Sequence, residues 1–329
     1  MARWLGKNML TLPDFKEKQI LFIKAEHGVF NKIKFENDNI VFMKNDGVVN
    51  RASCHKVFAV FILGDMTITT GILREAGRLG VSIFFLKNNF NSYASVGAVA
   101  DGNYLLRSAQ YGLLPNKEFL ISKMLVAGKI GNQIRLLEEN GKTEKSALIK
   151  INKLLKSAEK AKNSEELLGI EGNGSRIFFK EYFKELDWMR RTPRTRQDIP
   201  NFLMDIGYTI LFNFIDSLLN LYGFDTYKGV YHKLFFQRKS LSCDLVEPFR
   251  CLIDRQIRKS FNLKQIDKKD FEIADGKYEL SYKNSQKYSE IFMNAIMERK
   301  ENIYLFVQGF YRYFMDDKKY KFPEFKITK

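Results

Sequence analysis

The sequence predicts an α+β protein in which a small β-rich N-terminal domain precedes a larger, mainly α-helical domain. Short runs of β-branched and aromatic residues, separated by turn sequences, fill residues 19–86. From Tyr104 onward, apolar residues instead recur at the three-to-four spacing of helices. Because 329 residues, 45% of them hydrophobic, can form two buried cores, we expect domains at 1–95 and 96–329.

The first domain is predicted to contain five strands and one helix. Turn sequences at 36–39 and 45–47 lie between strands that we place at 20–23, 32–35, 39–43, 57–62 and 81–86. The segment 69–79 has apolar residues at helical spacing. The polar, glycine-containing stretch 87–102 is predicted to be the hinge between the domains.

The second domain is predicted to be mainly helical. Helical periodicity covers residues 104–137, 142–168, 174–188, 201–221, 245–257 and 288–314. The charged residues from Asp316 onward, which include a proline, are predicted to form a loosely held tail.

The charge of the chain favours a polyanionic partner. Lysine and arginine number 54 against 38 acidic residues, so the formal net charge is +16. Such an excess attracts nucleic acid, because each cation placed near a phosphate releases counterions. The alternative is a general lysine bias carried on solvated faces.

The cysteines and the hydropathy of the chain indicate a cytoplasmic, soluble protein. The three cysteines are odd in number and form no C-x-x-C pair, which argues against a disulfide framework. The N-terminal residues do not lead into the apolar core of a signal peptide, and we find no long uncharged apolar run. We therefore expect no membrane association.

The segment 231–250 gives the strongest indication of a catalytic or metal-binding site. His232 precedes Asp244 and Glu247, two acidic residues in an apolar run where unpaired charge is costly. On a helix these two carboxylates share a face, and Pro248 is expected to kink the helix or restart it just past Glu247. Imidazole and carboxylate ligands suit Mg²⁺ or Mn²⁺, whereas structural zinc would need thiolates. The alternative is an ordinary solvated acidic face.

A third ligand is needed for firm binding of such an ion, and Glu171 is the best candidate. It lies between Gly169 and Gly172, in what we interpret as a glycine-rich turn before a helix that begins near Ser175. The alternative is an ordinary loop between helices.

Several motifs, taken in order, resemble a known family. They are Ile170-Glu171-Gly172 leading to Tyr182-Phe183, the segment from 198–201 to 207–209, and His232 followed by the string S-L-x-x-D-L-x-E-P-F-R at 240–250. Together they resemble the CRISPR-associated integrase of the first Cas family, the enzyme of spacer acquisition. The resemblance covers nearly the whole chain and includes the segments 64–69 and 103–111.

The resemblance implies both an architecture and a set of partners. It implies a β-rich N-terminal domain that dimerises, a helical catalytic domain, and homodimers that bridge to a small companion acquisition protein. The DNA partners it implies are a double-stranded prespacer fragment and the CRISPR repeat.

The resemblance also implies the catalytic residues. Glu171, His232 and Glu247 fall on the metal ligands of the family, and Asp244 is an auxiliary acid close by. The implied reaction is transesterification, in which the 3′-hydroxyl of the fragment attacks a phosphate of the repeat with the help of Mg²⁺ or Mn²⁺. One departure is the segment 190–196, which is more basic than the resemblance leads us to expect.

Basic and aromatic side chains are the candidate DNA contacts. The candidates are Arg107, Arg190, Arg191, Arg194, Arg196, Arg238, Lys239, Arg250, Arg255 and Arg258, together with Tyr182 and Tyr208. The alternatives are ion pairs on helix surfaces for the basic residues and core packing for the two tyrosines.

Two other functions remain compatible with these residues. One is a structure-specific, metal-dependent nuclease that cuts branched DNA without joining it. The other is a non-catalytic DNA-binding scaffold whose acidic cluster is a buried ion-pair network.

Overall fold

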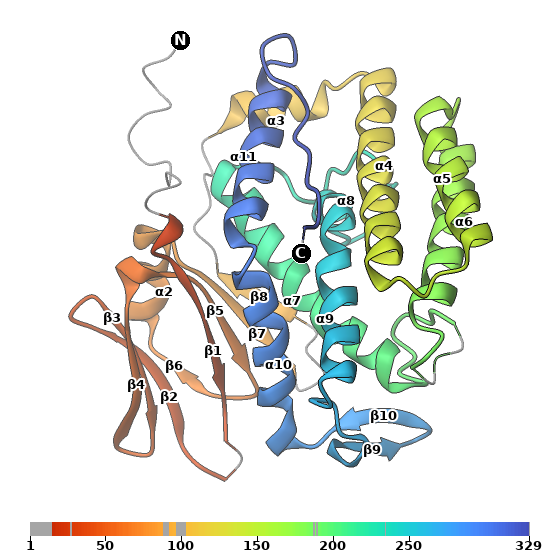
Figure 1. The fold of residues 1–329 in the computed structure, drawn as a ribbon. Helices are drawn as coiled ribbons and strands as arrows, with labels where there is room; N and C mark the ends of the chain where they lie inside the picture. The colour runs from red at the N-terminus through yellow and green to blue at the C-terminus, as the bar shows by residue number, and fades with distance from the viewer. Residues whose placement is uncertain are drawn as a thin grey trace.

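The computed structural model describes residues 15–26, 28–87, 92–96, 103–186, 188, 190–233 and 235–328. Two small sheets and a helix formed by the N-terminal part lie beside a larger body of helices formed by the rest of the chain (Figure 1). The predicted α+β fold class, β-rich first and helical second, is confirmed.

The N-terminal part contains two four-stranded sheets. One sheet has the strand order β1-β5-β7-β8 and the other β4-β3-β2-β6. The strands are β1 (Gln19–Lys24), β2 (Asn31–Glu36), β3 (Asn39–Lys44), β4 (Gly47–Ser53), β5 (Val57–Leu63), β6 (Thr67–Ile68), β7 (Ser82–Leu86) and β8 (Ser92–Val96). A 3-10 turn η1 (Cys54–Lys56) precedes β5, and helix α2 (Thr70–Leu79) connects β6 to β7.

Strand β5 joins the two parts of the molecule through one shared core. It pairs in parallel with β1 and with β7, and all of its residues are buried. Val60 and Ile62 point into the core between the sheets and α2, whereas Phe58 and Phe61 point into the core formed with the helices. A strand that is buried on both faces requires an unbroken apolar sequence, which is why this strand was readily predicted.

The helical part follows with nine α-helices among the described residues. They are α3 (Tyr104–Tyr111), α4 (Pro115–Asn140), α5 (Lys145–Lys160), α6 (Ser164–Tyr182), α7 (Ile199–Tyr222), α8 (Ser240–Val246), α9 (Arg250–Asn262), α10 (Tyr282–Met297) and α11 (Lys300–Met315), and the 3-10 turn η2 (Glu247–Phe249) separates α8 from α9. A turn η3 (Lys268–Asp270) and the antiparallel hairpin β9 (Phe271–Ala274) and β10 (Lys277–Leu280) lie between α9 and α10.

Three predicted helices are each divided in two in the structure. The segment 104–137 breaks at Gly112, because Pro115 occupies the first turn of α4. The segment 142–168 breaks because the side chain of Asn163 caps a new helix by accepting a hydrogen bond from the backbone N–H of Glu166. The segment 288–314 breaks between α10 and α11.

The predicted hinge at 87–102 is partly wrong. Residues 92–96 form β8, which pairs with β7 in an antiparallel manner and so extends the first sheet. The other residues of this stretch lie outside the described part, except for Lys87. The division of the chain at residue 95 therefore stays a prediction.

Helix α7 is long and apolar enough to cross a membrane by length and composition. However, 83% of its most apolar window is buried inside the protein. It packs against α8, α9, α10 and α11, as the core helix of a folded protein does.

The prediction of a loosely held C-terminal tail is wrong for its last described residues. Phe325 and Ile327 are buried, and the ring of Phe325 lies 4.5 Å from that of Phe249. The buried side chain of Asn132 on α4 donates hydrogen bonds to the carbonyl oxygens of Pro248 (2.9 Å) and Phe325 (3.0 Å). It also accepts one from the backbone N–H of Ile327. The tail is thus tied to α4 and to η2.

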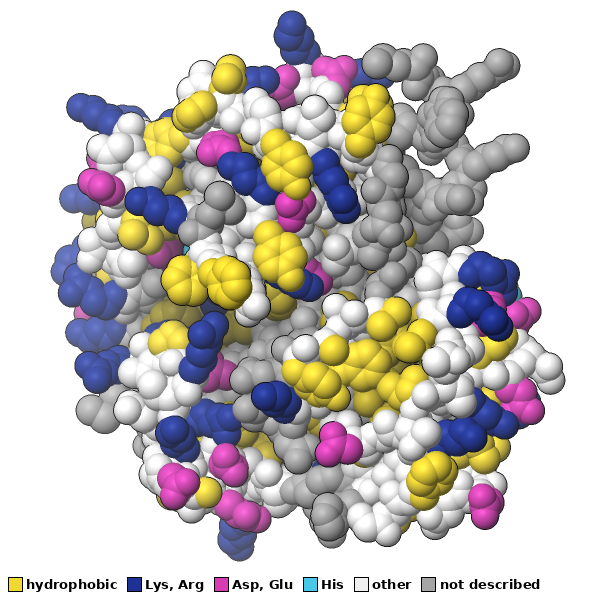
Figure 2. Space-filling model, turned by 180° about the vertical axis from the view of Figure 1, so that it is seen from behind, with side chains coloured by type: hydrophobic (Ala, Val, Ile, Leu, Met, Phe, Trp, Pro, Cys, Tyr) yellow, Lys and Arg dark blue, Asp and Glu magenta, His cyan; other side chains and the backbone are white. Residues whose placement is uncertain are grey.

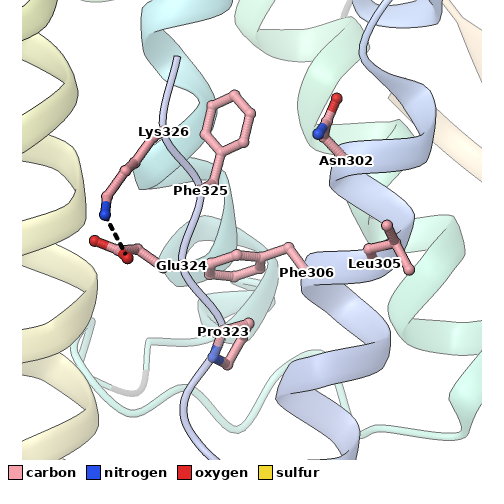
Figure 3. A pocket seen from close by; sticks show the side chains of 7 residues that line it. All are labelled: Asn302, Leu305, Phe306, Pro323, Glu324, Phe325 and Lys326. Atoms are coloured by element: carbon pink, nitrogen blue, oxygen red, sulfur yellow. Dashed lines mark ion pairs between the residues drawn. The ribbon is translucent and has the colours of Figure 1, made fainter. Parts of the chain in front are cut away.

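A small pocket lies between this tail and α11. Figure 3 shows the tail running between α4 and α11, with Asn302, Leu305 and Phe306 on the α11 side of the pocket. Glu324 and Lys326 of the tail form an ion pair of 2.8 Å that points toward α4. None of the residues proposed from the sequence as catalytic lines this pocket.

A buried hydrogen bond joins α7 to α9. The hydroxyl of Tyr208 donates to Asp254 Oδ1 at 2.5 Å, and both residues are buried. Burial is the largest influence on Asp254, and it raises the pKa of this carboxyl to about 7 although Tyr208 and Arg250 oppose the rise.

We predict that Asn132→Asp destabilises the fold by about 3 kcal/mol or more. The aspartate cannot donate to the two carbonyl oxygens, and each buried acceptor left without a partner costs about 1–3 kcal/mol. Urea unfolding measures the effect, with the exposed Asn302→Asp as the matched control. Equal stability of the two variants would contradict the anchoring role of Asn132.

We predict that Asp254→Asn removes part of the pH dependence of stability. A carboxyl whose pKa is higher in the folded chain stabilises the fold below its unfolded pKa, and this contribution is lost as the pH rises through the folded pKa. Relative to the wild type, the variant should gain about 2–4 kcal/mol of unfolding free energy between about pH 4 and pH 8.

The asparagine can still accept the hydrogen bond from Tyr208, so the comparison isolates the charge. Denaturant unfolding at several pH values measures the gain, and Asp275→Asn in the exposed β9–β10 turn is the control. Parallel pH profiles for the wild type and Asp254→Asn would contradict the raised pKa.

Candidate active site

The candidate site forms where α4, α6 and η2 meet. Glu171 lies on α6, well inside that helix, and Glu247 is the first residue of η2. The prediction of a glycine-rich turn around Glu171 is therefore wrong. The glycines are tolerated within α6, and Gly174 faces α4, where a Cβ would make an ordinary van der Waals contact of 3.5 Å with the side chain of Ile130.

Pro248 shapes the other side of the site in the way the sequence predicts. Helix α8 ends at Val246, the 3-10 turn η2 contains Pro248, and α9 begins at Arg250. Proline lacks a backbone donor, so the α-helical hydrogen bonding cannot run through this point. The break places the side chain of Glu247 against α4.

Glu171 and Glu247 converge on one cation, the ammonium group of Lys129. Lys129 Nζ lies 2.7 Å from Glu247 Oε2 and forms an ion pair with Glu171 Oε1. Ser175, one turn along α6, also donates a hydrogen bond to Glu171 Oε1 at 3.0 Å. The side chains of Lys129, Glu171 and Glu247 are only 11%, 16% and 6% exposed. Three charged groups therefore lie together in a largely buried site.

The charges around Glu247 keep it ionised. Burial acts to raise its pKa, but Arg250 and Lys129 outweigh this effect and lower the pKa to about 2. Arg250 Nη2 lies 3.0 Å from Glu247 Oε1, on the oxygen that Lys129 does not contact. Burial likewise acts to lower the pKa of Lys129, but Glu247 and Glu171 raise it above its usual value. Carboxylate and ammonium are thus the stable forms at neutral pH.

Asp244 fixes the position and the tautomer of His232. It is fully buried, and its Oδ1 lies 2.6 Å from His232 Nδ1. Its two oxygens also accept hydrogen bonds from the backbone N–H groups of Val230, Tyr231 and His232. Because a carboxylate can only accept, the proton of the neutral ring is on Nδ1 and the lone pair is on Nε2.

Gly229 allows this close approach. A Cβ at residue 229 would lie 2.7 Å from both Asp244 Oδ2 and Ser240 Cβ. Any other residue would push the loop away from α8. The glycine is therefore needed for the Asp244–His232 contact.

The residues at the site fit a hard divalent cation by their chemistry. Two carboxylates converge on one cation position, and an oriented imidazole whose Nε2 carries a lone pair lies on the neighbouring loop. Two buried polar atoms, Glu247 Oε2 and the Tyr231 hydroxyl, have no well-aligned hydrogen bond among the described residues. However, within the same described residues no group of three or more His, Cys, Asp or Glu side chains is already placed to hold a metal. The ammonium of Lys129 lies between the carboxylates instead.

The two tyrosines proposed as DNA contacts are core residues. Tyr182 is buried, and its ring stacks on that of Phe178 at 5.0 Å. Tyr208 is buried beneath Arg250, whose guanidinium lies 4.7 Å from the centre of the ring. Neither ring is placed to stack on a DNA base, so the core alternative holds for both.

Most of the basic candidates have partners within the protein. Arg258 is itself buried and pairs with Glu185 at 2.6 Å, so it is structural. The other contacts join Arg191 to Asp205, Arg196 to Glu279, Lys239 to Asp216, Arg255 to the carbonyl oxygen of Thr328, Arg107 to that of Gly223, and Arg238 to Cys243. Arg190 and Arg194 are exposed. All the basic candidates except Arg258 are partly or fully exposed, and a DNA role for them stays a prediction.

Sequence reasoning missed three features. Lys129 gives no local signal, since one lysine in an amphipathic helix is ordinary. Phe235 and Phe236, beyond His232 in the loop before α8, are 72% and 84% exposed. Helix α5 carries a row of exposed lysines at 145, 150, 153, 156 and 160. Lysine and arginine side chains line the edge on the left of Figure 2, which is the α5–α6 edge of Figure 1 seen from behind.

Comparison with known protein sequences identifies relatives along most of the chain. The model of the family described as "CRISPR associated protein Cas1" matches residues 28–294. The "CRISPR-associated endonuclease Cas1 1" of Thermodesulfovibrio yellowstonii is 28% identical over 87% of this chain and 95% of that relative. The protein of the same description from Chlorobaculum tepidum is 26% identical over 79% of this chain and 80% of that relative.

Solved structures share the fold. A Cas1 protein of Thermotoga maritima has a TM-score of 0.80 at 18% identity, covering 94% of this chain and 100% of that chain. A "Casposase bound to integration product" has a TM-score of 0.79 at 19% identity, covering 94% and 95%. A "Cas6-RT-Cas1--Cas2 complex" has a TM-score of 0.80 at 23% identity, and this chain covers only 36% of that longer chain. The family match over residues 28–294 establishes that the chain belongs to the Cas1 family of CRISPR-associated proteins.

Proposed function

We propose that this protein is a metal-dependent DNA integrase and endonuclease that inserts short DNA fragments into a CRISPR repeat array. The reaction is attack of a fragment 3′-hydroxyl on a phosphate of the repeat. The observation that carries the proposal is the convergence of Glu171 and Glu247 on one cation position beside the Asp244–His232 pair, in a chain of the Cas1 family.

The cation would be held by Glu171, Glu247 and His232 Nε2. When bound, Mg²⁺ or Mn²⁺ would polarise the phosphoryl oxygen and help to deprotonate the attacking hydroxyl. Glu171 and Glu247 supply the negative charge that attracts the ion. Asp244 holds the His232 ring in the tautomer that leaves Nε2 free to bind.

The remaining charges of the site suit a phosphodiester substrate. Arg250 balances Glu247 from the side opposite Lys129. The exposed lysines of α5, Arg190 and Arg194 offer contacts to the DNA backbone away from the site. With a net charge of +16, binding of DNA should weaken steeply as salt is added.

The protein partners are also part of the proposal. A structure of a Cas1–Cas2 complex among the structural relatives supports a small companion protein. A homodimer through the N-terminal part is supported by an apolar hollow lined by Ile62, Met66, Ile68, Phe85 and Tyr93. Figure 2 shows hydrophobic side chains gathered in a broad patch on this part of the molecule. Apolar patches of this kind mark contact surfaces.

We predict that Glu171→Gln, His232→Ala and Glu247→Gln each reduce strand joining by roughly 1,000-fold or more. Loss of a ligand removes charge stabilisation worth several kcal/mol in the barrier. The assay measures metal-dependent joining of a labelled oligonucleotide to a supercoiled plasmid that carries the repeat. Glu165→Gln, an exposed change on the same helix as Glu171, is the control and should join normally.

The same assay separates the proposal from the two other functions. Cutting of branched DNA without joining would indicate a nuclease instead of an integrase. Binding of DNA with neither cutting nor joining would indicate a scaffold. Normal joining by all three site variants would contradict the assignment of these residues.

The exposed pair Phe235 and Phe236 supports a contact with unpaired DNA. Both rings lie close in sequence to His232, between the exposed Lys233 and the basic residues Arg238 and Lys239. Aromatic rings among cations are typical of surfaces on which single-stranded bases stack. We propose that this pair holds the unpaired end of the fragment near His232.

We predict that the double variant Phe235→Ala/Phe236→Ala binds a duplex with a 3′ overhang about 10–100-fold more weakly. Stacking contributes about 1–3 kcal/mol per base, so a blunt duplex should lose much less affinity. Fluorescence anisotropy at fixed salt measures both affinities. Phe30→Ala, which removes a 54% exposed ring from the N-terminal part, is the control. Equal losses for the overhang and the blunt duplex would contradict the stacking role.

A further inference from the structure

Lys129 occupies the centre of the candidate cation site although an ammonium group cannot be a metal ligand. It comes from α4, and it contacts Glu171 of α6 and Glu247 of η2. Its side chain is 11% exposed, so most of its charge is removed from water. A lysine that is buried to this extent needs acidic partners, and here both partners are proposed metal ligands.

The site is balanced in charge by the protein's own residues. Lys129 contacts one oxygen of Glu247 and Arg250 contacts the other. Two carboxylates, Glu171 and Glu247, are thus matched by two cations. Without Lys129 the carboxylates would face each other in a nearly dry place, where like charges repel strongly.

The ammonium and a divalent ion cannot occupy this place together. Carboxylate oxygens bind Mg²⁺ at about 2.0–2.1 Å. Lys129 Nζ is 2.7 Å from Glu247 Oε2 and also pairs with Glu171. An ion that bridged the same two oxygens would overlap the ammonium and repel it. Lysine has a flexible four-carbon stem, so its head group can withdraw while α4 stays in place.

We propose that Lys129 is a built-in counter-ion of the cation site, which holds Glu171 and Glu247 together before a divalent ion arrives and which the ion must displace. This inference rests on the cation site of the proposed function. It has two consequences that oppose each other. Lys129 stabilises the metal-free fold, and it lowers the affinity of the site for the metal.

The test compares Lys129→Met with the wild type in the absence of DNA. Methionine keeps the unbranched apolar stem and removes the charge. We expect the variant to melt several degrees lower without metal, because the carboxylates lose their shared cation. We also expect it to bind Mn²⁺ about tenfold more tightly or better, since displacement of an ion pair is no longer required.

Two measurements provide the readout on the purified protein. Electron paramagnetic resonance of free Mn²⁺ gives the affinity, and thermal unfolding with and without Mn²⁺ gives the stabilisation by the metal. The control is Lys123→Met on the same helix, where the wild-type ammonium contacts the carbonyl oxygen of Glu159 instead of a carboxylate. It should leave the Mn²⁺ affinity unchanged.

The outcomes separate this inference from the function on which it rests. Mn²⁺ binding that is lost in His232→Ala but is equal or weaker in Lys129→Met would overturn the counter-ion role and leave the cation site standing. Absence of Mn²⁺ binding in both wild type and Lys129→Met would overturn the cation site itself. Should Lys129→Met not fold, Lys129→Gln, whose amide can still donate to both carboxylates, is judged by the same affinity criterion.

Discussion

The buried ion pairs that join Lys129 to Glu171 and Glu247 are the interaction on which the site depends. They connect α4, α6 and η2, three elements that lie far apart in the sequence. Arg250 completes the balance of charge on Glu247. Because an unpaired charge at this depth would be strongly destabilising, each group fixes the place of the others. The carboxylates are therefore held close together before any ligand binds.

Contacts elsewhere in the fold hold the elements that carry this cluster in place. Asn132, one turn beyond Lys129 on α4, bonds to the carbonyl oxygen of Pro248, the residue after Glu247. It also bonds to Phe325 and Ile327, so the same side chain ties the C-terminal tail to α4. The core between β5 and the helices, with Phe58 and Phe214 in edge contact at 5.6 Å, joins the N-terminal sheets to the same body. His232 lies on a loop, and Asp244 bonds both its ring and its backbone N–H.

The sequence predicts best the features that are set by residues close together along the chain. Strand β5 was predicted because burial on both faces leaves an unbroken apolar run, and the break at Pro248 was predicted because proline removes a donor. Strand β4 was missed, because its first five residues are exposed and show no alternation. Glu171 was placed in a turn because neighbouring glycines usually end helices. In the structure Gly169, Gly172 and Gly174 instead all lie inside α6.

The site was predictable only in part, because most of its contacts join residues far apart in the sequence. The spacing of Asp244 and Glu247 indicated an acidic pair. Glu171 was chosen as the third ligand from a glycine-rich segment that is helical in the structure, and the resemblance to a family implied the same residue. Lys129 could not be found, since its role exists only once α4 packs against α6 and η2. The burial of Tyr182, Tyr208 and Arg258 likewise depends on tertiary packing, which composition and spacing do not encode.

A structure of the protein determined with Mn²⁺ is the most direct test of this account, because anomalous scattering locates the ion. The account predicts an ion in contact with carboxylate oxygens of Glu171 and Glu247 and with His232 Nε2, and an ammonium group of Lys129 that has moved away from both carboxylates. An ion bound elsewhere, with Lys129 still bridging Glu171 and Glu247, would contradict it.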